Sequence, residues 1–160
     1  MELDLDRQEH GRSEIDISGT LDLGLGEGCP ASVTIAGSLE VQNLESRFLV
    51  SGKLQASGTT ECGRCLNEFE LKWDVPVSVM VIRNVDSDEE EGETLLILQS
   101  RGVADLQPPL RECTVLAYPQ SPVCREACQG ICVTCGIDLN HEVCQCKNDD
   151  YDPRWEGLPE

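Results

Sequence analysis

Four stretches of the chain alternate apolar and polar residues with a period of two. Their apolar positions are Ile15, Ile17, Leu21 and Leu23; Val33, Ile35 and Val41; Phe48, Val50 and Leu54; and Phe69, Leu71, Trp73, Val75, Val77, Val79 and Val81. This alternation is typical of β-strands that bury one face. Glycines at 24–28, 37–38 and 58 predict turns between them. Strands joined by short links favour an antiparallel sheet.

Two later segments change the pattern. The apolar run from Thr94 to Leu98 predicts one further strand. Within residues 103–117 the apolar residues recur at helical spacing, which predicts one short helix. These residues are Leu106, Leu110, Cys113 and Leu116 or Ala117. Asp105 is the candidate N-cap, and Pro108 and Pro109 fit the first turn, where a missing amide proton is no loss.

The tail from Tyr118 onward follows neither period and is rich in Pro, Cys, Gly and Asn. It has too few apolar residues to build a core of its own. The sequence therefore predicts an α+β protein, mainly antiparallel β-sheet with one short helix. The expected division is a β-rich domain over residues 1–118 and a cysteine-rich tail over residues 119–160, which packs on a hairpin tip at residues 62–65.

The chain is strongly acidic, with 30 Asp and Glu residues against 12 Lys and Arg and a formal net charge of −18. Six of the acids lie between Asp86 and Glu93, a run that predicts a solvated loop. Such a surface repels nucleic-acid phosphates, so it serves either solubility alone or attraction to a basic partner. The first residues carry acids, unlike a secretory signal, and no apolar stretch is long enough to cross a bilayer. We therefore expect a soluble, cytoplasmic protein.

Ten cysteines in such a chain favour metal ligands over disulfides, because the cytosol keeps thiols reduced. Eight of them form four close pairs: Cys62 and Cys65, Cys124 and Cys128, Cys132 and Cys135, and Cys144 and Cys146. Zinc takes four thiolates in a structural site, so eight predict two zinc ions. Gly136 directly follows Cys135, as in a zinc knuckle.

Four pairs can combine into two sites in three ways. We favour Cys132, Cys135, Cys144 and Cys146 as one local site, because a site made of these four residues closes a short loop. The hairpin pair would then meet Cys124 and Cys128 and clamp the tail to the hairpin. His141 could replace one ligand, but eight thiolates already suffice, so we expect it at the surface, as we do His10. Cys29 and Cys113 lie outside the pairs and fit small buried residues.

Other cysteine chemistry fits this sequence less well. A thioredoxin-like Cys-x2-Cys pair begins a helix, whereas Cys62 and Cys65 lie between two strands. An iron–sulfur cluster also takes four thiolates, and spacing alone leaves that alternative open. No nucleophile constellation or Gly-rich phosphate loop is present, and a closed zinc site has no open position for water. We therefore expect no enzymatic activity and no small-molecule substrate.

The order of these motifs resembles the YceD family of large-ribosomal-RNA accumulation proteins. The resemblance covers about residues 60–158. It depends on the motifs Cys62-Gly63-Arg64-Cys65-Leu66, Gly136-Ile137-Asp138-Leu139-Asn140, Cys144-Gln145-Cys146 and Asp152-Pro153-Arg154-Trp155. It implies a role in accumulation or processing of large-subunit (23S) ribosomal RNA, in the bacterial cytoplasm or in a chloroplast descended from it, with no reaction of its own. In the family the metal belongs to a cysteine-rich branch.

Two further functions are also compatible with this sequence. A zinc ribbon could bind RNA directly, although the tail offers few basic and aromatic residues for it: Arg125, Lys147, Arg154, Tyr151 and Trp155. Alternatively, the acidic surface could bind a basic ribosomal protein. The expected partner is in either case the assembling large ribosomal subunit, with no membrane involved.

Overall fold

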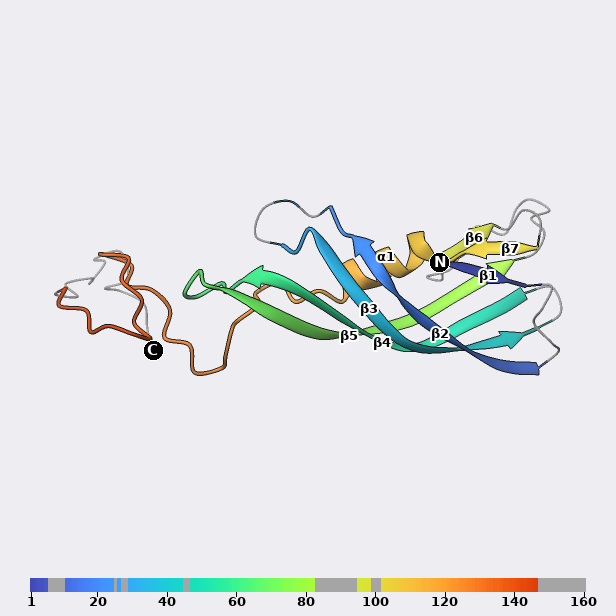
Figure 1. The fold of residues 1–160 in the computed structure, drawn as a ribbon, viewed down its shortest axis with the longest axis horizontal. Coiled ribbons are helices and arrows are strands. Elements are labelled where there is room, and N and C mark those ends of the chain that lie inside the picture. The colour runs from blue at the N-terminus through green and yellow to red at the C-terminus, as the bar shows by residue number, and fades with distance from the viewer. Residues whose placement is uncertain are drawn as a thin grey trace, which may run out of the picture.

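The computed structural model describes residues 1–5, 11–24, 26, 29–44, 47–82, 95–98 and 102–146. It contains the strands β1 (Glu2–Asp4), β2 (Gly11–Asp22), β3 (Ser32–Asn43), β4 (Arg47–Glu61), β5 (Glu68–Ile82), β6 (Leu95–Leu98) and β7 (Val103–Asp105) and the helix α1 (Gln107–Leu116) (Figure 1). The predicted α+β class, a mostly antiparallel sheet with one short helix and a cysteine-rich C-terminal part, is confirmed.

The main sheet has the strand order β2-β3-β4-β5-β6. Strands β2 to β5 form an antiparallel meander, in which β4 and β5 pair along their whole length from Arg47 opposite Ile82 to Glu61 opposite Glu68. Strand β6 pairs with β5 in parallel. A second, two-stranded antiparallel sheet joins β1 to β7. Among the described strands, β6 is the one parallel neighbour in a sheet that is otherwise antiparallel, as the prediction of a mainly antiparallel sheet allows.

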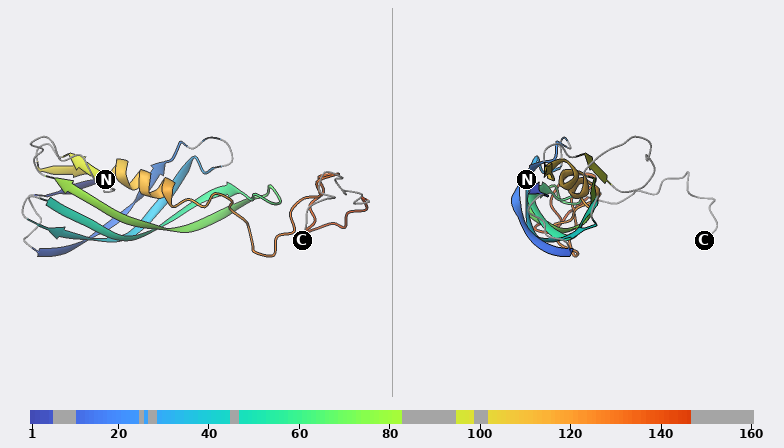
Figure 2. Two further views of the ribbon diagram at one scale, coloured as in Figure 1. Left: turned by 180° about the vertical axis from the view of Figure 1, so that it is seen from behind. Right: turned by 90° about the vertical axis from the view of Figure 1, so that its right-hand side faces the viewer.

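The alternating residues build one core. The sheet curves, and α1 lies on its concave side (Figure 2). The side chains that point inward are almost fully buried, among them Ile35, Leu39, Phe48, Val50, Leu54, Val75 and Val81. The Arg111 side chain of α1 donates hydrogen bonds to the carbonyl oxygens of Asp22 and Leu23, which ties the helix to the end of β2.

The helix differs from its prediction at both ends. Residues 103–105 form β7, so α1 begins at Gln107 with Leu106 as its N-cap. The Asp105 carboxylate still accepts a hydrogen bond from the Gln107 amide at 2.9 Å. Of the two alternatives for the last apolar position, Leu116 is 82% exposed, whereas Ala117 is half-buried and packs against the core. Thr114 is also buried and donates its hydroxyl proton to the Leu110 carbonyl, so a polar residue occupies the inner face.

Glycines 37 and 58 were expected in turns but lie inside β3 and β4. Gly37 is paired with Leu54, and Gly52 with Leu39. A Cβ at either glycine would come within 3.0 Å of the facing leucine side chain. Both glycines have a positive φ, of 150° and 152°. Each therefore makes room for the facing leucine side chain, a role that a turn prediction from sequence does not consider.

The segment after α1 is tied to the long β4–β5 hairpin and continues beyond its tip (Figure 1). The Tyr118 hydroxyl hydrogen-bonds the Thr60 hydroxyl at 2.8 Å, and its ring meets Trp73 edge to face at 5.4 Å. The tail thus begins in contact with the half of the hairpin that is nearer its tip. None of the helices in the described ranges is long and apolar enough to cross a membrane.

Candidate metal centre

The β4–β5 hairpin ends in a tight turn that carries the first cysteine pair, as predicted. Within it the Cys62 amide donates to the Asn67 carbonyl, and the Leu66 amide donates to the Cys62 carbonyl, both at 2.9 Å. Leu66 has a positive φ of 61°, which is uncommon for an apolar side chain. This turn places Cys62 and Cys65 near each other at the end of the hairpin, where both are buried.

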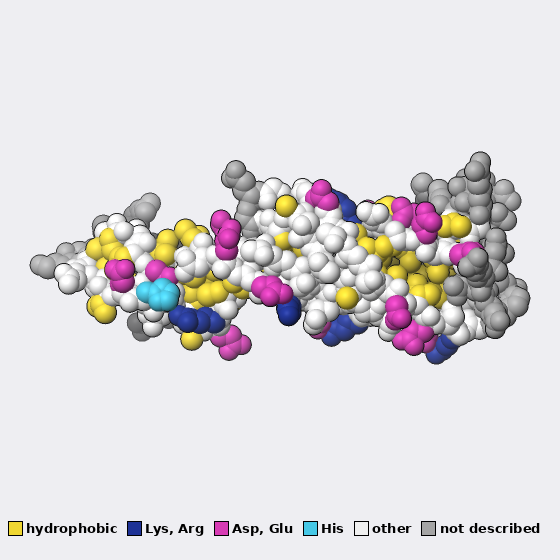
Figure 3. Space-filling view, viewed as in Figure 1, with side chains coloured by type: hydrophobic (Ala, Val, Ile, Leu, Met, Phe, Trp, Pro, Cys, Tyr) yellow, Lys and Arg dark blue, Asp and Glu magenta, His cyan; other side chains and the backbone are white. Residues whose placement is uncertain are grey.

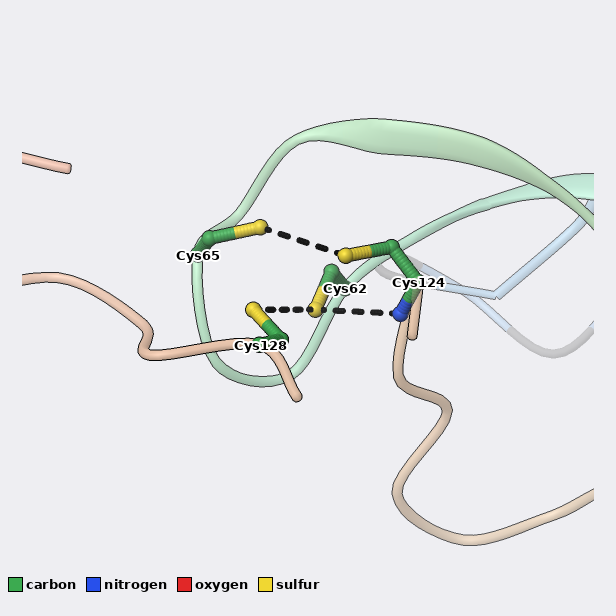
Figure 4. A group of neighbouring side chains, drawn as sticks. All are labelled: Cys62, Cys65, Cys124 and Cys128. Atoms are coloured by element: carbon green, nitrogen blue, oxygen red, sulfur yellow. Dashed lines mark hydrogen bonds between the residues drawn. The ribbon is translucent and has the colours of Figure 1, made fainter. Parts of the chain in front are cut away.

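Cys124 and Cys128 from the tail complete a first group, which we call the proximal set. The sulfur of Cys62 lies 3.9 Å from that of Cys128, and the sulfur of Cys65 lies 3.8 Å from that of Cys124. Figure 4 shows all four side chains directed toward one common point. Phe69 and Val123 pack against the set, so it lies in a small apolar cluster of its own.

Cys132, Cys135, Cys144 and Cys146 form a second group, the distal set. Its sulfurs lie 3.7 Å apart between Cys135 and Cys144, and 3.3 Å apart between Cys132 and Cys144. The Gly136 amide donates to the Cys132 carbonyl at 2.8 Å, and Gly136 has a φ of 74°. The chain therefore turns at the glycine that the sequence indicated.

Both sets have the dimensions of a four-thiolate site. All sulfurs within a set lie within 4.8 Å of one another, and all ten cysteines of the chain are free thiols. A tetrahedron with metal–sulfur bonds of about 2.3 Å has edges of about 3.8 Å. Three of the separations, 3.7–3.9 Å, agree with this value, and the fourth, 3.3 Å between Cys132 and Cys144, is shorter but still far from the length of about 2.05 Å of a disulfide. Each set could therefore hold one metal ion.

Each set combines thiols with unequal acidity. Burial raises the pKa of Cys62, but backbone N–H groups of Cys124, Cys65 and Arg64 outweigh it and lower the pKa to about 6. Burial raises the pKa of Cys124 to about 12.

In the distal set, the backbone N–H groups of Cys135 and Thr134 lower the pKa of Cys132 to about 6. Hydrogen bonding with the Cys144 thiol raises the pKa of Cys146 to about 12. One thiol of each set thus ionises readily, while another keeps its proton unless a cation compensates the charge.

Arg64 fixes the tail on the hairpin tip. Its Nη1 donates to the carbonyl oxygens of Glu126 at 3.2 Å and Cys128 at 3.0 Å. Its own carbonyl accepts the Ile131 amide at 3.0 Å. Gly130 lies so close that a Cβ there would come 3.0 Å from the Arg64 carbonyl oxygen. Sequence reasoning missed these two residues as contacts, although Arg64 lies between two of the predicted ligands.

The remaining candidates lie away from the two sets. His141 is exposed and has Asp138 as an ion-pair partner at 3.9 Å, as expected of a surface histidine. Cys113 is half-buried against the main core, and burial raises its pKa. Cys29 is also half-buried. His10, the acid run 86–93 and the residues 147–160, with their Asp-Pro-Arg-Trp motif, lie outside the described residues.

Fold and site together define a β-sheet protein whose hairpin tip and C-terminal tail bring together two four-cysteine groups. The sequence profile of the family "Large ribosomal RNA subunit accumulation protein YceD" matches residues 50–160. This is more than half of the chain, and it includes both groups. The chain therefore belongs to the YceD family.

Curated relatives are similar over most of this chain. Uncharacterized proteins of Mycobacterium bovis and Mycobacterium tuberculosis are 31% identical over 125 residues, which is 76% of this chain and 59% of theirs. An uncharacterized protein of Mycobacterium leprae is 27% identical over 123 residues, or 75% of this chain and 55% of its own length. The chain thus spans little more than half of these relatives. No solved structure matches it.

Proposed function

We propose that the protein is a non-catalytic, cytoplasmic factor for the accumulation or processing of large-subunit ribosomal RNA. The main observation behind this proposal is the family match over residues 50–160, a range that includes the hairpin tip and the tail. The proposal includes the two-part organisation, with a β-rich domain over residues 1–118 and a tail over residues 119–160. The tail then serves as a zinc-stabilised attachment to the hairpin tip.

The eight cysteines of the two sets are the proposed ligands of two zinc ions. Zinc is the metal that most often takes four thiolates in a closed tetrahedral site, and the sulfur separations fit its bond length. The tail residues around these thiols include strongly exposed apolar side chains, Val133 and Val143, so hydrophobic burial gives it little order. Metal binding is then the main source of its folding free energy.

The proposed partner is a basic component of the assembling large subunit. On the face in Figure 3, acidic side chains are spread along the molecule and the few Lys and Arg side chains form no patch. The two arginines nearest the proximal set are also engaged: Arg64 with tail carbonyl groups and Arg125 with Asn140. This arrangement favours a basic protein over RNA as the direct contact.

Elemental analysis tests the metal part of this proposal. Protein prepared under reducing conditions without chelator should contain two zinc ions per chain. The Cys132→Ser/Cys135→Ser variant should retain one. Iron in place of zinc would instead identify an iron–sulfur protein, and no metal at all would contradict the proposal.

A deletion strain tests the cellular role. Loss of the gene should lower mature large-subunit ribosomal RNA and raise its precursors, while small-subunit RNA stays at the normal level. Expression of this chain should restore both. Purified protein should bind large-subunit particles from the deletion strain at a rate that falls as salt rises, because salt screens attraction between exposed charges. Unchanged ribosomal RNA in the deletion strain would refute the role.

A further inference from the structure

The loop of the distal set forms part of the surroundings of the proximal set. Residues 137–141 lie in the chain between Cys135 and Cys144, yet they contact the segment that carries Cys128 and the hairpin tip. The Leu139 amide donates to the Gly130 carbonyl at 2.9 Å. The Asp138 carboxylate accepts a hydrogen bond from the Asn67 side chain of the hairpin, also at 2.9 Å.

Asn140 makes the most direct of these contacts. Its Nδ2 donates to the sulfur of Cys128 at 3.5 Å and to the Asp138 carboxylate at 2.6 Å. Its Oδ1 accepts from the Arg125 side chain at 2.8 Å and from the Gln129 amide at 3.0 Å. The two acceptor contacts fix which end of the amide faces the thiol. One side chain of the distal loop thus touches three residues of the segment 125–129.

The position of Asn140 depends on the distal set. The loop is closed by Cys132 and Cys135 on one side and Cys144 on the other. Its internal hydrogen bonds include the Cys132 amide to the Ile137 carbonyl and the Asn140 amide to the Asp138 carboxylate, and none of those in the described residues joins it to Cys144 except through the sulfurs. An ion held by the four distal thiolates would therefore order the residues that carry Asn140 and Asp138.

From these contacts we infer that the two metal sets are coupled, with Asn140 as the positioning residue that transmits occupancy of the distal set to Cys128 of the proximal set. This inference rests on the proposed metal binding and deepens it. Loss of a hydrogen bond to a metal ligand from an outer residue typically lowers metal affinity about 10–100-fold. Filling the distal set first then strengthens binding at the proximal set.

Site-specific thiol protection tests the coupling. The reduced, metal-free full-length chain is equilibrated at a series of buffered zinc concentrations and pulse-alkylated. Mass spectrometry then gives protection at Cys128 for the proximal set and at Cys135 for the distal set. The variants are Asn140→Ala, Asn140→Asp, Cys132→Ser/Cys135→Ser and the combination of Asn140→Ala with the double cysteine variant. His141→Ala, one residue away and exposed, is the control.

Coupling predicts that the Cys132→Ser/Cys135→Ser variant needs about 10–100 times more zinc to protect Cys128. Asn140→Ala should lower the zinc affinity of the proximal set by a similar factor. The combined variant should bind zinc at this set no more weakly than the double cysteine variant, because the two changes break one interaction. Asn140→Asp keeps the acceptor oxygen for Arg125 and Gln129 but loses both donor contacts, to the Cys128 sulfur and to the Asp138 carboxylate, and should lower the zinc affinity of the proximal set at least as much.

Two results overturn the inference, and they can be told apart. If both sets bind zinc in the wild-type chain but Asn140→Ala and the double cysteine variant leave Cys128 protection unchanged, the sets are independent and only the coupling fails. If zinc protects neither Cys128 nor Cys135 in the wild-type chain, the proposed metal binding fails together with it.

Discussion

Two glycines of the tail have similar backbone conformations but different surroundings. Gly130 has a φ of 76° and Gly136 a φ of 74°. A Cβ at Gly130 would come 3.0 Å from the Arg64 carbonyl oxygen, whereas a Cβ at Gly136 would meet nothing within 4 Å. A comparison of substitutions at these two glycines therefore distinguishes the cost of backbone strain from the cost of disturbing the contact between tail and hairpin.

We predict that Gly130→Ala destabilises the tail more than Gly136→Ala. Both alanines take a left-handed conformation, which costs about 1–2 kcal/mol, but only the first must also displace the Arg64 carbonyl. The rate of tail cleavage in limited proteolysis measures the difference. Equal rates for the two variants would show that the close approach of Gly130 to Arg64 does not hold the tail.

At the scale of the strand, the paired Gly37–Leu54 and Gly52–Leu39 contacts determine how β3 and β4 pack. We predict that Gly37→Ala and Gly52→Ala each lower the free energy of unfolding by about 1–3 kcal/mol, because the new Cβ is strained at positive φ and meets a buried leucine. Chemical denaturation measures this. Gly19→Ala is the matched control, since its Cβ would meet only the flexible Met1 side chain; a loss as large as that of Gly37→Ala would contradict the explanation.

The elements that the sequence predicts correctly are those in which one physical signal dominates. Strict alternation identified the long strands, and the Cys-x2-Cys spacing identified the hairpin tip. Strands β1 and β7 have three residues each, too few to show a period. The parallel pairing of β6 with β5 is a contact between segments that are separated in sequence, which no local pattern specifies. The contacts of Arg64, Gly130 and Asn140 join segments that are distant in sequence, although Asn140 ends the Gly-x-x-Leu-Asn motif.

For the whole molecule, the proximal set is the main connection between sheet and tail. We predict that Cys62→Ser/Cys65→Ser keeps the sheet, observed by circular dichroism, but exposes residues 118–130 to protease, because the remaining hydrogen bonds between hairpin and tail, among them those of Arg64, Asn67 and Tyr118, hold the tail weakly. Cys29→Ser/Cys113→Ser is the control, since both residues lie outside the sets. A tail as resistant as in the wild type would show that the proximal thiols are not what attaches it.

The proximal set also joins parts of the chain that are 59 and 66 positions apart, so a metal bound there acts as a cross-link. An ion that binds the folded site but not the unfolded chain adds its binding free energy to the stability of every element that must fold to form the site. The enclosed loop contains β5, β6, β7 and α1, most of which never touch the metal. The distal set spans only 9 and 12 positions, so an ion there stabilises the tail alone. Loss of a single ion from the hairpin tip would thus lower the free energy of unfolding of elements that lie far from it in the sequence.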